Sequence, residues 1–431
     1  MRFINKYKIL VISFFISFSV QAQINFNHYF EHKTLRFDFI LTGNKTAQQA
    51  GLLKLHQEPV WGGPVNILID PFDYGEYMVK LYDKKDNNLI YSKSLSTLFQ
   101  EWVTTAEAEK ITKSYTNSIV TPFPRNEAIL VLEHRNRENA QFEAFFRMEI
   151  NPESVFIDHS PKQDHKITKL QYNGDPSQKV DLVVLAEGYT SDEQQKFLQD
   201  ARRLCDSLFS LAPYDKHKDD FNIWAVHLES KNSGTDYPGI DKWSDTALNS
   251  GFWTFDSERY LTIADYLPIR DAIWNVPSDA VMILVNSEKY GGGGIYNFYA
   301  IGTADNRLSA RVMAHEFGHN FAGLGDEYFD SSTSYENFYS LKTEPWEPNI
   351  TTLVHFESKW KDMIPAGTPV PTPVDHSDPG KIGVFEGGGY ISKGIYRPQD
   401  RCLMRDNSLI CPVCQRAIVR MIDFYCGREQ K

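Results

Sequence analysis

Residues 313–328 read MAHEFGHNFAGLGDEY and place two histidines and an acidic residue at the spacing of one helical face. Residues four apart in an α-helix lie on the same side, so His315 and His319 can present two imidazoles to one ion, with Glu316 beside them. This H-E-x-x-H spacing is typical of zinc peptidases, in which the histidines bind the metal and the glutamate is the general base. The segment therefore predicts a metal site with an adjacent base.

The predicted site has the parts needed to hydrolyse a peptide bond. A catalytic zinc ion takes three protein ligands and leaves a fourth position for water, whose pKa it lowers. Glu316 would accept a proton from this water and return it to the leaving amine. The alternative is an amphipathic helix with two hydrogen-bonded histidines, because short matches also arise by chance. The neighbouring residues favour the metal site.

Helix signals on both sides of the motif indicate where a third ligand enters. Asp305-Asn306 can cap the start of the helix. Gly323 and Gly325 can end it by adopting positive φ, which would turn the chain back toward the metal. The first oxygen ligand after this turn is Asp326, followed by Glu327. Adjacent residues point in different directions, so we expect one of the two to bind the metal. Asp326 is favoured over Glu327, and the residue that does not bind would orient a ligand imidazole.

Residues 1–22 have the features of a cleaved secretory signal peptide. Three basic side chains precede the apolar run Ile9–Val20, and the small-residue exit Val20-Gln21-Ala22 follows it. The run is too short to span a membrane, and no later segment approaches about 18 uninterrupted apolar residues. We therefore expect a secreted or periplasmic protein without a membrane span.

Charge and length limit the classes of function. The chain has 431 residues and a formal net charge of -11. Such an acidic surface repels phosphate backbones, which argues against nucleic acid as a partner and against a basic membrane-binding face. The length exceeds what one hydrophobic core usually serves, so two domains are expected. Nothing in the sequence indicates the oligomeric state.

The N-terminal segment, residues 23–152, has the pattern of an antiparallel β-sandwich. Apolar and polar residues alternate from Leu35 to Leu41, and residues 65–69 form a further apolar run. Polar turns separate paired strand candidates and predict hairpins, namely residues 76–82 with 89–93 and residues 128–133 with 141–150. The polar, proline-containing stretch 153–178 is expected to be a linker.

From residue 179 to 431 the pattern predicts an α/β domain, so the whole chain should have a multidomain α+β fold. Residues 180–185 and 280–285 suit buried strands, and a helix should begin at Ser191. The glycine run within residues 290–299 leads into an aromatic strand. It could be an edge strand where substrate approaches closely, as in zinc endopeptidases, or a flexible hairpin loop.

Cysteine usage fits an exported protein. Four of the five cysteines lie near the C-terminus, and the full set is Cys205, Cys402, Cys411, Cys414 and Cys426. We expect one or two disulfides among them. The alternative is a structural zinc site made of Cys402, Cys411, Cys414 and Cys426, which is disfavoured because the group contains a single C-x2-C pair.

Several further segments accompany the helix, namely Leu185-Ala186-Glu187-Gly188-Tyr189, Val384-Phe385-Glu386-Gly387-Gly388, Tyr396-Arg397-Pro398, and Cys402-Leu403-Met404-Arg405 followed by Cys411-Pro412-Val413-Cys414. Together with residues 313–328 they resemble the IgA peptidase family of bacterial zinc metallopeptidases over essentially the whole chain. The resemblance implies an N-terminal β-sandwich ahead of a metzincin-like catalytic domain.

The resemblance also implies roles for individual residues. Zinc would bind His315, His319 and Asp326, Glu316 would be the base, and Met404 would lie in a methionine turn beneath the metal. Metzincins usually have a glycine three residues after the second histidine and the third ligand three residues later. Here position 322 is Ala and Gly323 comes one residue late, so the third ligand is displaced by one.

A tyrosine near the metal could stabilise the oxyanion of the reaction. Tyr396 is the candidate because it precedes the expected methionine turn, and Tyr328 and Tyr390 are alternatives. Arg397 could bind a substrate carbonyl, but a structural pair with Glu386 is preferred.

Two functions follow from these observations. The first is an exported zinc-dependent endopeptidase acting on a protein or glycoprotein. The alternative is a secreted protein whose β-sandwich binds a glycan or protein while the metallopeptidase domain is catalytically silent. The first is favoured because Glu316 and all the candidate ligands are present. The residues do not encode which substrate is cut.

Overall fold

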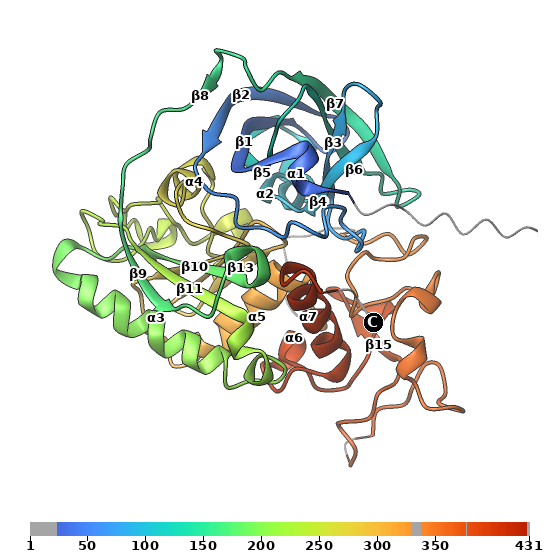
Figure 1. Cartoon of the computed structure of the whole chain (residues 1–431). Coiled ribbons are helices and arrows are strands. Elements are labelled where there is room, and N and C mark those ends of the chain that lie inside the picture. The colour runs from blue at the N-terminus through green and yellow to red at the C-terminus, as the bar shows by residue number, and fades with distance from the viewer. Residues whose placement is uncertain (1–23, 330–337, 376, 429–431) are drawn as a thin grey trace, which may run out of the picture.

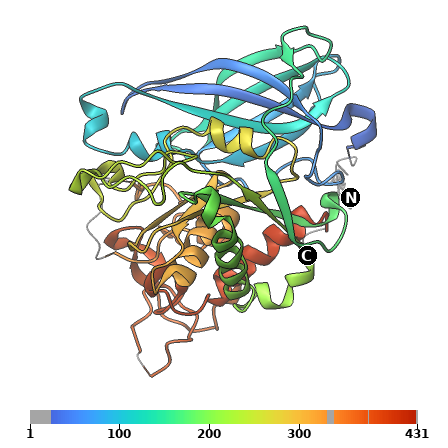
Figure 2. The same ribbon diagram turned by 90° about the vertical axis from the view of Figure 1, so that its left-hand side faces the viewer.

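The computed structural model describes residues 24–329, 338–375 and 377–428. The predicted signal peptide lies outside the described residues. Figure 1 shows a β-rich N-terminal part above a mixed α/β part, and the side view in Figure 2 shows the same two layers. The mixed, multi-sheet organisation is as predicted. Among the described residues, no helix has the length and apolar character needed to cross a membrane.

Two four-stranded sheets form the N-terminal part, with strand orders β5-β1-β2-β8 and β4-β3-β6-β7. Both predicted hairpins are confirmed, as β3 with β4 and as β6 with β7. Alternate side chains of each strand point inward, so Phe37, Val79 and Leu130 form one buried core between the sheets. The elements are α1 (Phe26–Tyr29), β1 (Phe30–Gly43), β2 (Gln48–Glu58), β3 (Tyr77–Asp83), β4 (Leu89–Leu95), α2 (Leu98–Trp102), β5 (Lys113–Pro124), β6 (Ala128–Arg135), β7 (Phe142–Ile150) and β8 (Ile157–Asp158).

A six-stranded sheet of order β13-β14-β12-β10-β11-β9 is the centre of the second part. The inner strands β14, β12, β10 and β11 are parallel, and the two edge strands are antiparallel to their neighbours. Every residue of β10 and β12 is buried, which explains their continuous apolar sequences. The strands are β9 (Lys166–Gln171), β10 (Val180–Glu187), β11 (Phe221–His227), β12 (Ala280–Val285), β13 (Gly292–Ile295) and β14 (Tyr299–Thr303).

Helices cover this sheet, and a separate hairpin follows them. A capping box between Thr190 and Glu193 precedes the first long helix, close to the predicted start at Ser191. Helix α5 contacts β13 and β14 on one side and α3 and α7 on the other, which makes it the central helix of this part. The elements are α3 (Gln194–Leu208), α4 (Leu267–Ala272), α5 (Ser309–Ala322), β15 (Phe385–Gly388), β16 (Ile391–Arg397), α6 (Leu403–Asp406) and α7 (Pro412–Tyr425).

Two predictions are corrected by the structure, namely the linker at residues 153–178 and the apolar run at residues 65–69. Residues 153–178 are not a simple linker, because β8 pairs with β2 and β9 pairs with β11, so this stretch adds a strand to each part. Residues 65–69 form no strand. The side chain of Asp70 accepts hydrogen bonds from the backbone N–H groups of Phe72 and Ser94, which replaces a strand ladder along β4.

A buried network of charges joins the two parts of the chain. Arg36 of β1 donates two hydrogen bonds to Asp38 at 2.7 and 2.8 Å and one to Asp271 of α4 at 2.6 Å. Arg270 of α4 donates to Glu58 of β2 at 2.9 Å. Burial alone would raise the pKa of Asp38, but its bonds to His56 and Arg36 lower it to about 2. Asp38 is paired within β1, whereas Asp271 and Glu58 are each paired with an arginine of the other part of the chain.

Replacing Arg36 by alanine should strongly destabilise the protein, because Asp38 would remain buried without its main partner. We expect the free energy of unfolding to fall by about 3–5 kcal/mol, measured by chemical denaturation. Lys231→Ala is the control, since its ion pair with Asp245 is exposed and should contribute little to stability. Equal losses in the two variants would contradict the role of the network.

Candidate active site

Helix α5 carries the predicted metal ligands and is held by its apolar face. Phe317 and Phe321 are buried and stack on each other at 5.1 Å between ring centroids. The predicted cap is wrong, because the N-cap residue is Leu308 and no side chain caps the helix; the Asn306 side chain instead accepts from the N–H of Leu308 in the preceding turn. Gly323 ends the helix at φ +62°, and its N–H donates to the carbonyl of His319. This left-handed residue turns the chain back, as predicted.

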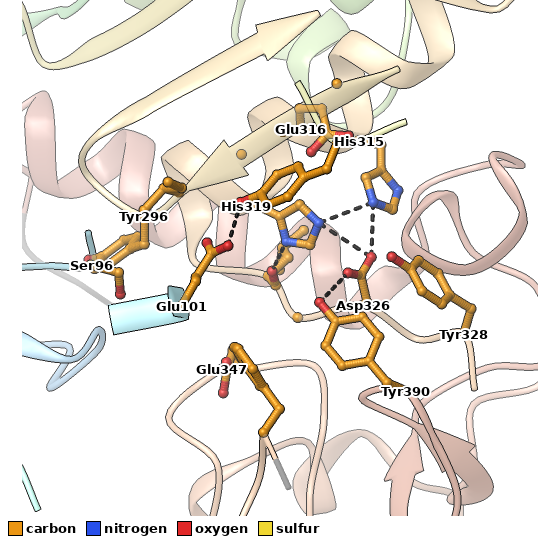
Figure 3. Close-up of a pocket in the computed structure, with 18 of the residues that line it drawn as sticks. Ser96, Glu101, Tyr296, His315, Glu316, His319, Asp326, Tyr328, Glu347 and Tyr390 are labelled. Carbon is orange, nitrogen blue, oxygen red and sulfur yellow. Dashed lines mark hydrogen bonds and ion pairs between the residues drawn. The ribbon is translucent and has the colours of Figure 1, made fainter. Parts of the chain in front are cut away.

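The turn brings Asp326 to both histidines (Figure 3). The Nε2 atoms of His315 and His319 are 3.1 Å apart. Asp326 Oδ1 lies 3.0 Å from the first and 3.3 Å from the second. Nitrogen and oxygen ligands about 2.0–2.1 Å from a tetrahedral zinc ion would be about 3.3 Å apart. These three residues therefore have the spacing of one metal site.

The position of the ring hydrogens of His315 and His319 shows why their Nε2 atoms, together with Asp326 Oδ1, would be stabilised by a cation. His315 Nδ1 lies 3.0 Å from the carbonyl oxygen of Leu403, and His319 Nδ1 contacts that of Leu324. A carbonyl only accepts, so each Nδ1 carries the hydrogen, and each neutral ring presents a lone pair at Nε2. Asp326 Oδ1 is buried with no hydrogen-bond donor among the described residues. This donor set fits a divalent metal.

Without a metal, protons would have to take its place. Burial lowers the pKa of His319, but attraction to Asp326 outweighs this effect and raises it to about 9. Burial likewise opposes ionisation of Asp326, yet the two histidines hold the pKa of its carboxyl well below the usual range. Metal binding would therefore release protons from the histidines and become weaker at low pH.

Two tyrosines lie at the ligands, but Tyr396 does not. The Tyr390 hydroxyl donates to Asp326 Oδ2 at 2.7 Å, and the Tyr328 ring stacks 6.5 Å from that of His315. Tyr390 is at the tip of the β15–β16 hairpin, where its N–H donates to the carbonyl of Tyr328. Tyr396 lies further along β16, pairs through its backbone with Thr351, and is not among the residues that line the cavity. The prediction for Tyr396 is therefore wrong in position.

Arg397 has the structural role that was preferred, although its partners differ. It donates to the backbone carbonyls of Glu386 and Gly387, and to the Asp400 side chain. The expected pairing with the Glu386 carboxylate is not found. Arg397 therefore fastens the hairpin whose tip carries Tyr390.

Glu316 lies against the glycine strand β13. A Cβ atom on Gly292 would come within 2.9 Å of Glu316 Cγ, and one on Gly294 would come within 2.3 Å of the Glu316 carbonyl oxygen. Desolvation raises the pKa of the Glu316 carboxyl, although His315 and His319 act in the opposite direction. The glycines are thus required by the close approach of α5.

The glycine strand is at the edge of the sheet, as one interpretation of the sequence expected. Its outer side is nevertheless partly covered, because the N–H of Leu261 donates to the carbonyl of Gly292 at 3.3 Å. This hydrogen bond belongs to an isolated parallel bridge between Tyr260 and Gly292. The geometry therefore gives no support to pairing of a substrate along the whole of β13.

A cavity of about 560 Å³ opens in front of the three ligands. The second part of the chain supplies Glu316, Arg259 and the two tyrosines, and the β-sandwich supplies another wall. The wall residues from the sandwich are Glu76, Ser96, Thr97, Gln100 and Glu101. Both parts of the chain therefore build the site.

Glu327 does not orient an imidazole, contrary to expectation. It is fully buried and faces away from the histidines, and its Oε1 accepts from Asn349 Nδ2 at 2.9 Å. Backbone carbonyls orient the imidazoles instead.

Met404 is buried beneath α5, since a Cβ on Gly318 would lie 3.0 Å from its sulfur atom. The N–H of Glu327 donates to the Met404 carbonyl at 2.9 Å.

The expected disulfides are not found. All five cysteines lie in the described residues, and all five are free and buried. Cys426 is separate from the C-terminal cluster, with its sulfur 3.8 Å from the carbonyl oxygen of Asp220. Glu327 occupies the place next to Cys402, Cys411 and Cys414 that the sequence assigned to Cys426. Sequence spacing alone did not reveal that Glu327 takes this place, because Glu327 lies far from the three cysteines in the chain.

Comparison with known protein families agrees with this arrangement. The model described as IgA Peptidase M64 matches residues 168–380 and 374–422, and the model described as Peptidase M64 N-terminus matches residues 25–146. The chain belongs to the IgA peptidase M64 family. This is a metallopeptidase family, so the protein is a peptidase and its substrates are proteins. A comparison with curated proteins found no match.

Removing the Tyr390 hydroxyl should weaken metal binding. In Tyr390→Phe, Asp326 Oδ2 loses its donor, and we expect affinity for a divalent metal to fall about 10–100-fold, measured by competition with a chelating dye. Tyr396→Phe is the matched control and should bind metal as the wild type does. Weakening by Tyr396→Phe alone would show that the positions of the two tyrosines have been misassigned.

Proposed function

We propose that the protein is an exported zinc-dependent endopeptidase in which Glu316 is the general base. The main support is the convergence of three lone-pair atoms, from His315, His319 and Asp326, beside Glu316 at the cavity. The apolar run near the N-terminus supports export. The displaced glycine of the sequence is compatible with this site, because Gly323 is the residue that makes the turn.

The proposed chemistry divides between the metal and the side chains. A zinc ion held by His315, His319 and Asp326 would polarise the substrate carbonyl and lower the pKa of a water molecule. Glu316 accepts a proton as this water attacks and passes it to the leaving amine. Desolvation raises the pKa of the Glu316 carboxyl, which makes it a better proton acceptor.

Tyr328 is better placed than Tyr396 to stabilise the oxyanion. It lines the cavity beside His315, and Arg259 Nη2 donates to its hydroxyl oxygen at 3.5 Å. Arg259 also lies over the Tyr328 ring, 5.6 Å from the centroid. A hydroxyl polarised by a neighbouring cation is a stronger donor to an oxygen that becomes negative. Tyr390 is held by Asp326 and has a supporting role.

Replacing Glu316 by glutamine should abolish most of the activity without loss of zinc. The amide cannot accept the proton, so we expect kcat/KM to fall by at least about 100-fold on a protein substrate or peptide library. Glu386→Gln, which changes an exposed carboxylate of β15, is the control and should remain active. A chelator should inactivate the wild type, and added zinc should restore it.

Two results would refute the proposal. One is the same set of fragments from wild type and Glu316→Gln, and the other is no cleavage by a wild-type protein with zinc bound. The second result would favour the alternative of a binding protein with a silent metal site.

A further inference from the structure

A second group of metal-ligating side chains lies beside the proposed catalytic centre. It consists of Glu327, Cys402, Cys411 and Cys414, and one ligand atom from each lies within 4.8 Å of the others. All four residues are buried, with an exposed fraction of 2 % or less. Glu327 follows Asp326, Cys402 precedes α6, and the other two cysteines start α7. The four side chains come from different segments of the chain, and the fold brings them together.

The separations in this cluster match tetrahedral coordination. The sulfur atoms of Cys402 and Cys414 are 3.8 Å apart, and Cys414 Sγ is 3.4 Å from Glu327 Oε1. Zinc–sulfur bonds of about 2.3 Å and zinc–oxygen bonds of about 2.0 Å place tetrahedral ligands about 3.8 Å (S to S) and about 3.5 Å (S to O) apart. A disulfide requires sulfur atoms about 2.05 Å apart. The distances favour a metal site.

Glu327 supplies an independent observation. Its Oε2 atom is buried with no hydrogen-bond partner among the described residues, while Oε1 accepts from Asn349. Burial of an incompletely paired carboxylate is strongly unfavourable. A cation between this carboxylate and the three sulfur atoms would remove that cost.

The start of helix α7 is suited to bind a cation through thiolates. Cys411 is at the N-cap position, and its sulfur accepts from the N–H of Cys414 at 3.5 Å. The positive end of a helix and an N–H donor both favour an ionised thiol. The C-x2-C spacing also lets one turn contribute two ligands, as in many structural zinc sites.

We propose that Cys402, Cys411, Cys414 and Glu327 bind a structural zinc ion separate from the catalytic centre. Three thiolates and a carboxylate complete a tetrahedron and leave no position for water, which is the mark of a structural site. Thiolate ligands select zinc over the hard cations magnesium and calcium. The three thiols release their protons when the metal binds.

This ion would hold the segments that orient the catalytic ligands. Glu327 is next to Asp326, and its N–H bonds to the Met404 carbonyl. On the other side of the cluster, Cys402 is next to Leu403, whose carbonyl accepts from His315 Nδ1. Loss of the second ion should therefore loosen both the third catalytic ligand and the orientation of the first imidazole.

Metal analysis of the full chain without its catalytic ligands tests the proposal. The wild type should contain about two zinc ions per chain, and a His315→Ala/His319→Ala double variant should retain about one. X-ray absorption of the double variant should show zinc–sulfur bonds of about 2.3 Å, and cobalt substitution should give a sulfur-to-cobalt charge-transfer band. Absence of metal from the double variant, absence of sulfur ligation, or a disulfide among the three cysteines would overturn the proposal.

A matched pair of cysteine variants assigns the ligands. Cys414→Ser should lose the sulfur-to-cobalt band and unfold at a lower temperature, whereas Cys426→Ser, which changes another buried cysteine, should retain the band. Retention of the full band by Cys414→Ser would overturn the assignment. If Cys414→Ser does not fold, the spectrum of the double variant decides. These readouts report metal ligation and not hydrolysis, so they are independent of the proposed peptidase mechanism.

Discussion

Two imidazole nitrogens and one carboxylate oxygen meet with their lone pairs directed at one point, and the surrounding structure maintains this arrangement. The Nδ1 hydrogens of His315 and His319 are bound to backbone carbonyls, so neither ring can turn its N–H toward the other while both are neutral. The three side chains are mostly buried, at 12 %, 15 % and 6 % exposure, so the repulsion among their lone pairs is only partly screened by water. Helix α5, the turn at Gly323 and the Met404 segment together hold the three atoms where a cation would bind.

The β-sandwich is part of the site and does not merely precede it. Its residues form one wall of the cavity, so the space available to a substrate depends on how the two parts associate. The buried ion pair of Arg270 with Glu58, and the contact of the buried Arg36 with the half-exposed Asp271, fix that association. Buried ion pairs need well-defined geometry to offset the loss of hydration, and they therefore define one relative position of the two parts. The fold connects stability at this interface with the shape of the cavity.

The sequence predicts what depends on local spacing. The helix with His315 and His319, its end at Gly323, the N-terminal hairpins and the buried strands of the α/β domain all follow from periodicity and turn residues. Contacts between residues far apart in the sequence could not be predicted from such local patterns. Tyr396 was chosen by its nearness in sequence to Met404, whereas hairpin geometry places the Tyr390 hydroxyl at Asp326, one of the proposed metal ligands. Glu327 was assigned to the wrong partners for the same reason, because the cysteines that surround it come from the C-terminal helices.

The identity of the three catalytic ligands is the central claim, and anomalous diffraction at the zinc absorption edge tests it most directly. Crystals of the wild-type protein grown without chelator should show an anomalous peak bonded to Nε2 of His315, Nε2 of His319 and a carboxylate oxygen of Asp326. A peak whose third ligand is Glu327 in place of Asp326, or no peak between the two imidazoles when zinc is supplied, would contradict the account.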